Sequence, residues 1–154
     1  MRALLASIYN AIVNLGGTNT GGIYPDLAAG VTVTSGKSYA YGSFAQVVAA
    51  ATVTVASWLT HVIVDVFYIA TGEAYQAQIG TGASGSEAAM TGSTWRVGHQ
   101  EASAVGELPY QVWSFSPYPL YVAAATRLSA RAAAASANNR SLGVSVAYRS
   151  GIGS

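Results

Sequence analysis

Apolar and polar residues alternate along most of the chain after residue 31, and this is the period of a half-buried β-strand. The segments with this pattern are 31–34, 38–44, 47–59, 61–70, 74–80, 93–101, 110–116 and 141–149. Turn-forming residues separate them, as at Ser35-Gly36-Lys37. The pattern therefore predicts a mainly β domain over residues 31–154, an antiparallel β-sandwich or jelly roll of about eight strands.

One Ala-rich stretch, residues 120–137, fits two structures. Alanine is the best helix former, and Arg127 and Arg131 would share one face of a helix. If the stretch is a strand, both arginines lie on one face. The opposite face then carries mostly apolar residues, namely Leu120, Val122, Ala124, Thr126, Leu128, Ala130 and Ala132. The Asn138-Asn139 pair suits a hairpin turn into the last strand. We therefore predict a strand here.

The first fifteen residues follow a different period. An a/d heptad seam is formed by apolar residues spaced four and three apart: Met1, Leu5, Ile8, Ile12 and Leu15. Two heptads are too short for a stable isolated helix, so the segment must pack on other copies of the chain or on its own domain. We predict a helical oligomerisation or docking segment over residues 1–15 and a Gly-rich linker over residues 16–30.

Charge is scarce in this chain of 154 residues. Only 8% of the residues are charged, against roughly 25% in an average soluble protein. A surface with so little charge is poorly protected against association, so we expect much of it to be buried against other chains. The arginines are scattered along the sequence, which argues against a nucleic-acid partner.

A Gly-rich segment joins two predicted strands at residues 77–90. Gly80, Gly82 and Gly85 superficially match the G-x-G-x-x-G motif of dinucleotide-binding proteins. That motif opens a helix inside a βαβ unit, whereas strands surround the segment here. We therefore predict a structural turn, formed by these glycines and Glu87, and no cofactor.

No group of reactive residues stands out in the sequence. The two histidines, His61 and His99, lack the neighbouring ligands that a metal site needs, and no serine lies in a G-x-S-x-G elbow. The sequence therefore predicts neither an enzyme nor a metal site. The carboxylate of Glu87 is instead expected to accept hydrogen bonds from the amides of its own turn, or to pair with Arg127 or Arg131.

Aromatic residues are a better guide to binding, because their faces anchor protein interfaces and stack on sugars. We expect the three tryptophans, Trp58, Trp95 and Trp113, to lie in the core. Two tyrosines, Tyr118 and Tyr121, lie near prolines and are expected at the surface. The residues of the expected interface are Tyr118, Tyr121, Arg127 and Arg131.

Three segments together resemble small virion proteins of tailed bacteriophages. They are the aromatic-rich strand that contains Trp58, the QIGTGASGSE run at 78–87 and the SPYPLYVAAATRLSAR run at 116–131. The resemblance covers roughly residues 45–149 and rests on turn and packing signatures. It implies a jelly-roll capsid cement, or decoration, protein that sits on the major capsid protein at the virion surface as a homotrimer. It supplies no catalytic residues.

Two other classes of protein compete with this interpretation. One is a phage fibre or tail accessory protein with a carbohydrate-binding β-sandwich. The other is a lipid-active pore former, which the low charge and the apolar N-terminal segment would allow. That segment lacks the basic face of a membrane-surface helix and is too short to span a bilayer, so we expect no membrane partner.

Overall fold

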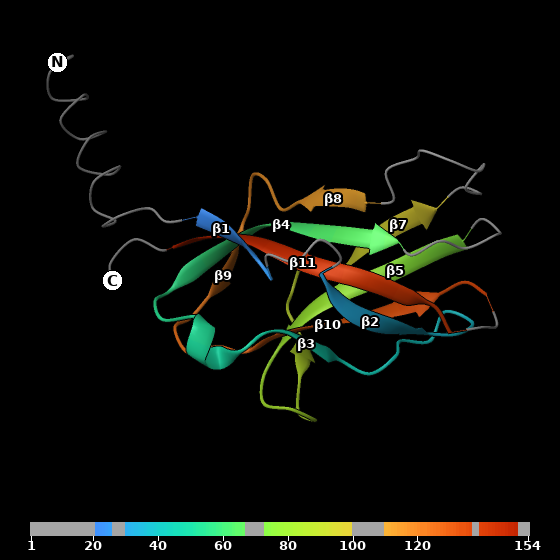
Figure 1. Cartoon of the computed structure of the whole chain (residues 1–154), viewed down its shortest axis with the longest axis horizontal. Coiled ribbons are helices and arrows are strands. Elements are labelled where there is room, and N and C mark those ends of the chain that lie inside the picture. The colour runs from blue at the N-terminus through green and yellow to red at the C-terminus, as the bar shows by residue number, and fades with distance from the viewer. Residues whose placement is uncertain (1–20, 26–29, 67–72, 100–109, 137–138, 151–154) are drawn as a thin grey trace, which may run out of the picture.

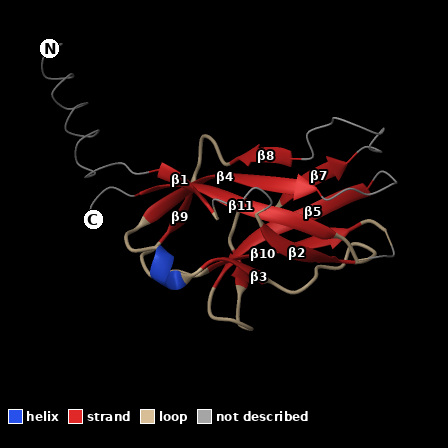
Figure 2. Ribbon diagram, in the orientation of Figure 1, coloured by secondary structure: helices blue, strands red, loops and turns tan. Residues whose placement is uncertain are grey.

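In the part of the chain that the structure describes, nearly all the regular structure is β-strand (Figures 1 and 2). The structure is a computed structural model that describes residues 21–25, 30–66, 73–99, 110–136 and 139–150. The strands are β1 (Gly21–Tyr24), β2 (Val31–Gly36), β3 (Ala45–Val48), β4 (Ser57–Val66), β5 (Glu73–Thr81), β6 (Ala88–Ala89), β7 (Trp95–His99), β8 (Tyr110–Ser114), β9 (Leu120–Val122), β10 (Leu128–Ala134) and β11 (Ser141–Ser150). One short 3-10 helix, η1 (Ala50–Thr52), follows β3. The mainly β class predicted from the alternating pattern is confirmed.

The strands form one curled sheet, a half-barrel in which the order is β6-β5-β10-β2-β11-β4-β8. Four strands lie off this path: β1 pairs with β11, β3 with β10, β7 with β5, and β9 with β4. The two strands at the open side, β7 and β8, each pair with one neighbour among the described strands. The core lies inside the curl (Figure 1).

The early strand β2 is inserted between the last two strands, β10 and β11. It pairs with β10 through Ala132↔Ser35 and with β11 through Leu142↔Val33. The predicted hairpin between 120–137 and 141–149 is therefore wrong. A strand between two mutually antiparallel neighbours must run parallel to one of them, so β2 and β10 are parallel. The prediction of a purely antiparallel sheet is therefore wrong for the β2–β10 pair.

The Ala-rich stretch is β-structure, as predicted, and not helix. It forms two strands, because the chain breaks pairing after β9 and resumes it at β10. Ala125 adopts φ 56° in the break, and its N–H donates to the Val53 carbonyl at 2.7 Å. In β10 the predicted faces are correct, since Leu128, Ala130 and Ala132 are buried in the core and Arg131 points to the other side.

Two predicted strands are interrupted. Residues 38–44 form a loop, because Ser38 and Tyr39 take positive φ values of 52° and 63°. The loop folds back onto β2 so closely that a Cβ on Gly42 would lie 2.4 Å from the carbonyl oxygen of Thr34. Only glycine fits there. The segment 47–59 is divided by η1, so β3 ends at Val48 and β4 begins at Ser57.

The predicted N-terminal segments are only partly described. The heptad residues of 1–15 lie outside the described residues. The prediction of a linker over residues 16–30 is wrong at Gly21–Tyr24, which form β1. This strand pairs with β11 from Gly21↔Arg149 to Tyr24↔Val146. The chain bends at Pro25, directly after this strand.

Removing a core side chain should cost far more stability than removing the same side chain from the surface. Ile79 on β5 is fully buried, whereas Ile23 on β1 is 49% exposed. We expect Ile79→Ala to lower the free energy of unfolding by about 2–5 kcal/mol, and Ile23→Ala to lower it by under about 1 kcal/mol. Urea denaturation of both variants checks this, and equal losses would contradict the placement of the core.

Candidate functional site

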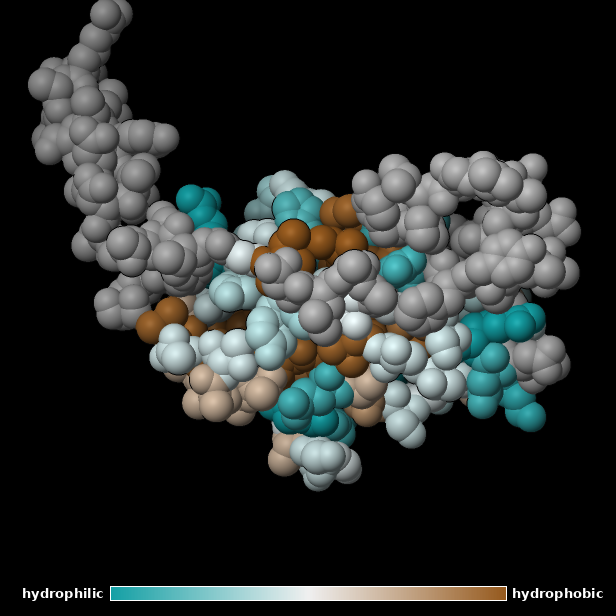
Figure 3. Space-filling view, in the orientation of Figure 1, coloured by the Kyte–Doolittle hydropathy of each residue, from teal (hydrophilic) through white to brown (hydrophobic). Residues whose placement is uncertain are grey.

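Exposed apolar side chains gather along one edge of the sheet, where β8 and β9 both pair with β4. We call this set of residues the aromatic edge: Trp58, Val112, Trp113, Tyr118 and Tyr121. Their exposed fractions run from 37% for Trp58 to 82% for Tyr118. Apolar surface is visible around β8 in Figure 3. Gathered exposed apolar side chains mark binding sites more often than scattered ones do.

Two members of the aromatic edge hold each other in place. Trp58 on β4 and Tyr121 on β9 are directly opposite in the strand register. Their ring centroids lie 5.2 Å apart with the planes at 65°, an edge-to-face contact that contributes about 0.5–1.5 kcal/mol. Both rings still present area to solvent, so the pair is a rigid, preformed contact surface.

The position of the tryptophans corrects one prediction. Trp95 on β7 is buried in the core, as expected, with 1% of its surface exposed. Trp58 and Trp113 were also expected in the core, and this is wrong, because 37% of Trp58 and 43% of Trp113 are exposed. Trp113 lies on β8, the last described strand on this side of the sheet, whereas Trp58 lies on the paired strand β4 and is exposed on its face. The expected exposure of Tyr118 and Tyr121 is confirmed.

Val112 was missed by sequence reasoning, although it is 56% exposed at the centre of β8. The signal was present in the sequence. The strand YQVWS (110–114) contains no charged residue, which is unusual for a strand that pairs on one edge only among the described strands. Sequence alone does not say which strand is at the edge of a sheet, so this signal could not be read without the topology.

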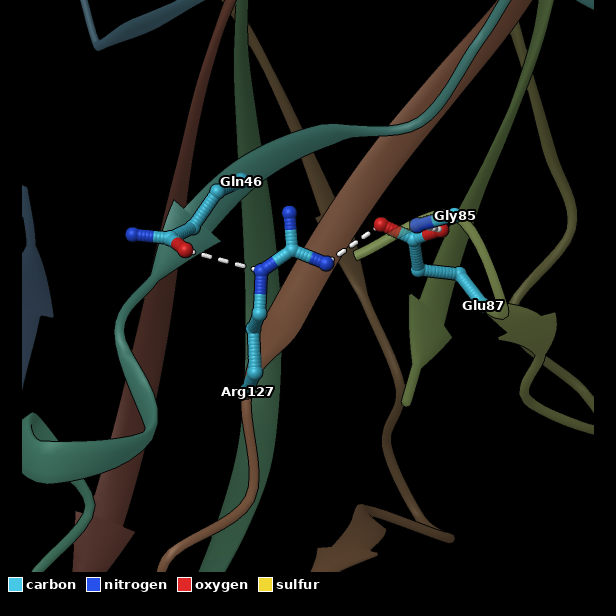
Figure 4. A network of polar contacts seen from close by, with 4 residues as sticks. All are labelled: Gln46, Gly85, Glu87 and Arg127. Carbon is cyan, nitrogen blue, oxygen red and sulfur yellow. Dashed lines mark hydrogen bonds and ion pairs between the residues drawn. The ribbon is translucent and has the colours of Figure 1, made fainter. Parts of the chain in front are cut away.

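The Gly-rich turn forms a second polar centre, built around Glu87 (Figure 4). One carboxylate oxygen of Glu87 accepts a hydrogen bond from the backbone N–H of Gly85 at 2.8 Å. The other pairs with the guanidinium of Arg127. The Nε–H of Arg127 donates to the side-chain oxygen of Gln46 on β3 at 2.8 Å. Both partners predicted for Glu87, the turn amide and an arginine, are therefore confirmed, and the arginine is Arg127.

The side chains of the ion pair are partly shielded, with 6% of the Glu87 side chain and 15% of the Arg127 side chain exposed, whereas Gln46 and Gly85 lie at the surface. The hydrogen bond from Arg127, together with the N–H of Gly85, holds the pKa of Glu87 below its ordinary value of 4.5. Figure 4 shows Arg127 lying between Gln46 and the turn. The network thus joins the β5–β6 turn to β3 and to the beginning of β10, and its role in the fold is structural.

Arg131 makes a separate set of contacts. Its guanidinium carbon lies 4.5 Å from the ring centroid of Tyr41 and 4.6 Å from that of Phe44, and its Nε–H donates to Gln78 at 2.9 Å. Burial raises the pKa of Tyr41, and the charge of Arg131 opposes this rise. The structure therefore uses Arg127 and Arg131 in contacts within the chain, and neither lies with Tyr118 and Tyr121.

The described residues include a cavity but no grouped metal ligands. They contain no cluster of three or more His, Cys, Asp or Glu side chains that could hold a metal ion. A cavity of about 130 Å³ is lined by these residues: Val48, Thr52, Val53, Thr54, Val55, Ser57, Leu59, Val122, Leu128 and Tyr148. Its lining is aliphatic and hydroxylic. None of the helices in the described ranges is long and apolar enough to cross a membrane.

The two turn glycines with positive φ should differ in their tolerance of alanine. Gly85 has φ +81° with open space around it, whereas Gly82 has φ +128° and a Cβ there would lie 2.8 Å from the Ser86 carbonyl oxygen. We expect Gly85→Ala to cost about 1–2 kcal/mol of stability through backbone strain alone, and Gly82→Ala to cost more. Thermal unfolding monitored by circular dichroism checks the order, and a reversed order would contradict this turn geometry.

The Glu87 network should make stability depend on acid pH. The pKa of Glu87 is lower in the folded chain than in the unfolded chain. The ionised carboxylate therefore stabilises the fold fully above about pH 4.5, and this stabilisation is lost as the pH falls through the folded-state pKa. We expect Glu87→Gln to be less stable than wild type at pH 7 and to approach it at pH near 2. Denaturation curves from pH 7 down to about pH 2 measure this difference.

A double-mutant cycle with Arg127→Gln provides the control. If the ion pair carries the effect, the double variant should lose less stability than the sum of the two single variants. Additive losses, or a Glu87→Gln variant whose deficit is the same at every pH, would contradict the network.

Comparisons of this chain with models of protein families, with curated protein sequences and with solved structures each yield no match. No family assignment follows from them.

Proposed function

We propose that this chain is a structural virion protein, a capsid cement or decoration protein that binds the major capsid protein at the virion surface. The observation that carries the proposal is the aromatic edge, a neutral and preformed surface on a rigid sheet. Protein interfaces are enriched in tryptophan and tyrosine at their centre and are depleted of charged residues there. A protein that stabilises a lattice needs contact area and no chemistry.

The low charge of the chain supports the same function. With 8% charged residues and a single lysine, a free monomer has little protection against association. In a virion, such a surface is covered by neighbouring subunits. The proposal includes a homo-oligomeric state, with a trimer as the expected form, in which the heptad residues of segment 1–15 are available for contact between copies.

The proposal also includes a jelly-roll fold, in which the curled sheet corresponds to a partly closed sandwich. The half-barrel and the insertion of β2 between distant strands support it, because long connections between non-consecutive strands are typical of Greek-key and jelly-roll proteins. Such a fold presents loops and edge strands to a partner while its core remains rigid.

Removing exposed tyrosines from the aromatic edge should weaken capsid binding without unfolding the chain. Tyr118 and Tyr121 are 82% and 54% exposed, and Tyr39, which is 74% exposed on the β2–β3 loop, provides a matched control. We expect Tyr118→Ser and Tyr121→Ser to weaken binding by about tenfold or more and Tyr39→Ser to leave it unchanged. Co-sedimentation with expanded capsid shells of the virus that encodes the chain measures this.

A failure of the wild-type chain to bind those shells would overturn the proposal. The exposed Trp58–Tyr121 pair also suits a second candidate, the carbohydrate-binding fibre or tail accessory protein, because aromatic rings stack on sugars. Quenching of tryptophan fluorescence by a panel of host-surface glycans, together with absent shell binding, would favour that candidate.

A further inference from the structure

We propose that β8 is a strand-pairing site for a second copy of this chain, with the two β8 strands antiparallel about a two-fold axis at Val112. This contact goes beyond the proposed function, because it joins two copies whether or not they bind a capsid. The strand β8 is the last in the sheet order, and among the described strands it pairs with β4 on one side.

The edge of β8 that has no partner among the described strands presents a regular set of backbone donors and acceptors. The N–H of Phe115, one residue past β8, donates to the Thr60 carbonyl at 2.9 Å. In an antiparallel pair, successive residues alternate between facing the partner and facing away. The N–H and C=O groups of Val112, and those of the residues two positions either side of it, therefore point outward from the sheet.

This edge lacks the features by which natural proteins prevent strand pairing. Edge strands are usually protected by charged side chains, prolines or bulges. The other strand at the open side, β7, carries the exposed Arg96. The sequence of β8, YQVWS, has neither charge nor proline, and its register with β4 from His61↔Ser114 to Asp65↔Tyr110 is continuous. A smooth, neutral edge of this kind is suited to pairing with another strand.

The sequence of β8 is compatible with pairing to itself, which makes a second copy of the chain a suitable partner. With a two-fold axis at Val112, that residue faces the partner's Val112. Gln111 then faces the partner's Trp113, and Tyr110 faces the partner's Ser114. No pair places like charges together, and a β-branched pair with an aromatic neighbour favours strand pairing. A two-fold contact is closed, so it forms a pair of chains and does not grow into a filament.

The division of the aromatic edge follows from this pairing. The β8 residues Val112 and Trp113 would lie in the contact between copies. The remaining members are Trp58 on β4, Tyr118 in the β8–β9 loop and Tyr121 on β9. They stay available to another partner. Two trimers joined to each other through their β8 strands contain an even number of chains, and this assembly is compatible with both the expected trimer and the β8 pairing.

Charged substitutions at Val112 test the two-fold axis directly. Val112 is 56% exposed, so a long charged side chain there is compatible with the folded chain. In a two-fold contact, Val112→Lys places two positive charges opposite each other and Val112→Glu two negative charges. We expect light scattering on the full chain to give an even number of chains for the wild type and half that mass for each variant. Mixing the two variants should restore the wild-type mass, because opposite charges then face each other.

Two controls separate this result from misfolding and from a general effect of charge. Restoration by mixing shows that both variants are folded, and Tyr39→Lys adds the same charge at an exposed site elsewhere, so its mass should match the wild type. A wild-type mass of one or three chains would overturn the proposal, as would unchanged mass in the variants or failure of the mixture to recover. Shell binding is measured separately, so the capsid function can fail while the strand pairing holds.

Discussion

The central strand β10 is covered on both faces and paired on both edges, and the arrangement of the other strands depends on it. It pairs with β5 along one edge and with β3 and β2 along the other. Six of its seven residues are buried. A strand in this position needs small side chains, because the core packs on one face and the 38–44 loop runs along it. Its alanines meet that requirement, and the loop donates to it from Tyr39 and Gly42.

The polar residues of this region fix the surroundings of β10. Arg131, the one partly exposed residue of the strand, lies against the rings of Tyr41 and Phe44 and so holds the loop to the sheet. Arg127, just before the strand, holds the β5–β6 turn through Glu87. Two arginines in one short segment thus attach two different loops to the same central strand. Their charges are satisfied within the chain, which leaves even less charge for the surface.

The sheet edge at β8 has the reverse character. Among the described strands, β8 pairs with β4 alone, and its residues from Gln111 to Ser114 are neutral and exposed. The sheet is therefore well covered at its central strand β10 and less covered at its edge strand β8. Under the proposed function, the covered centre keeps the chain folded while the edge contacts a partner.

The sequence predicted the mainly β pattern and the strand in the Ala-rich stretch, because both depend on local periodicity. It also predicted the partners of Glu87, because the chain contains few possible charge partners. The insertion of β2 between β10 and β11 could not, since strand order is decided by packing between residues about a hundred positions apart. The exposure of Trp58 on β4 and of Trp113 on β8 could not be predicted either. Alternation says which face of a strand is apolar, whereas only the tertiary structure decides whether another strand covers it.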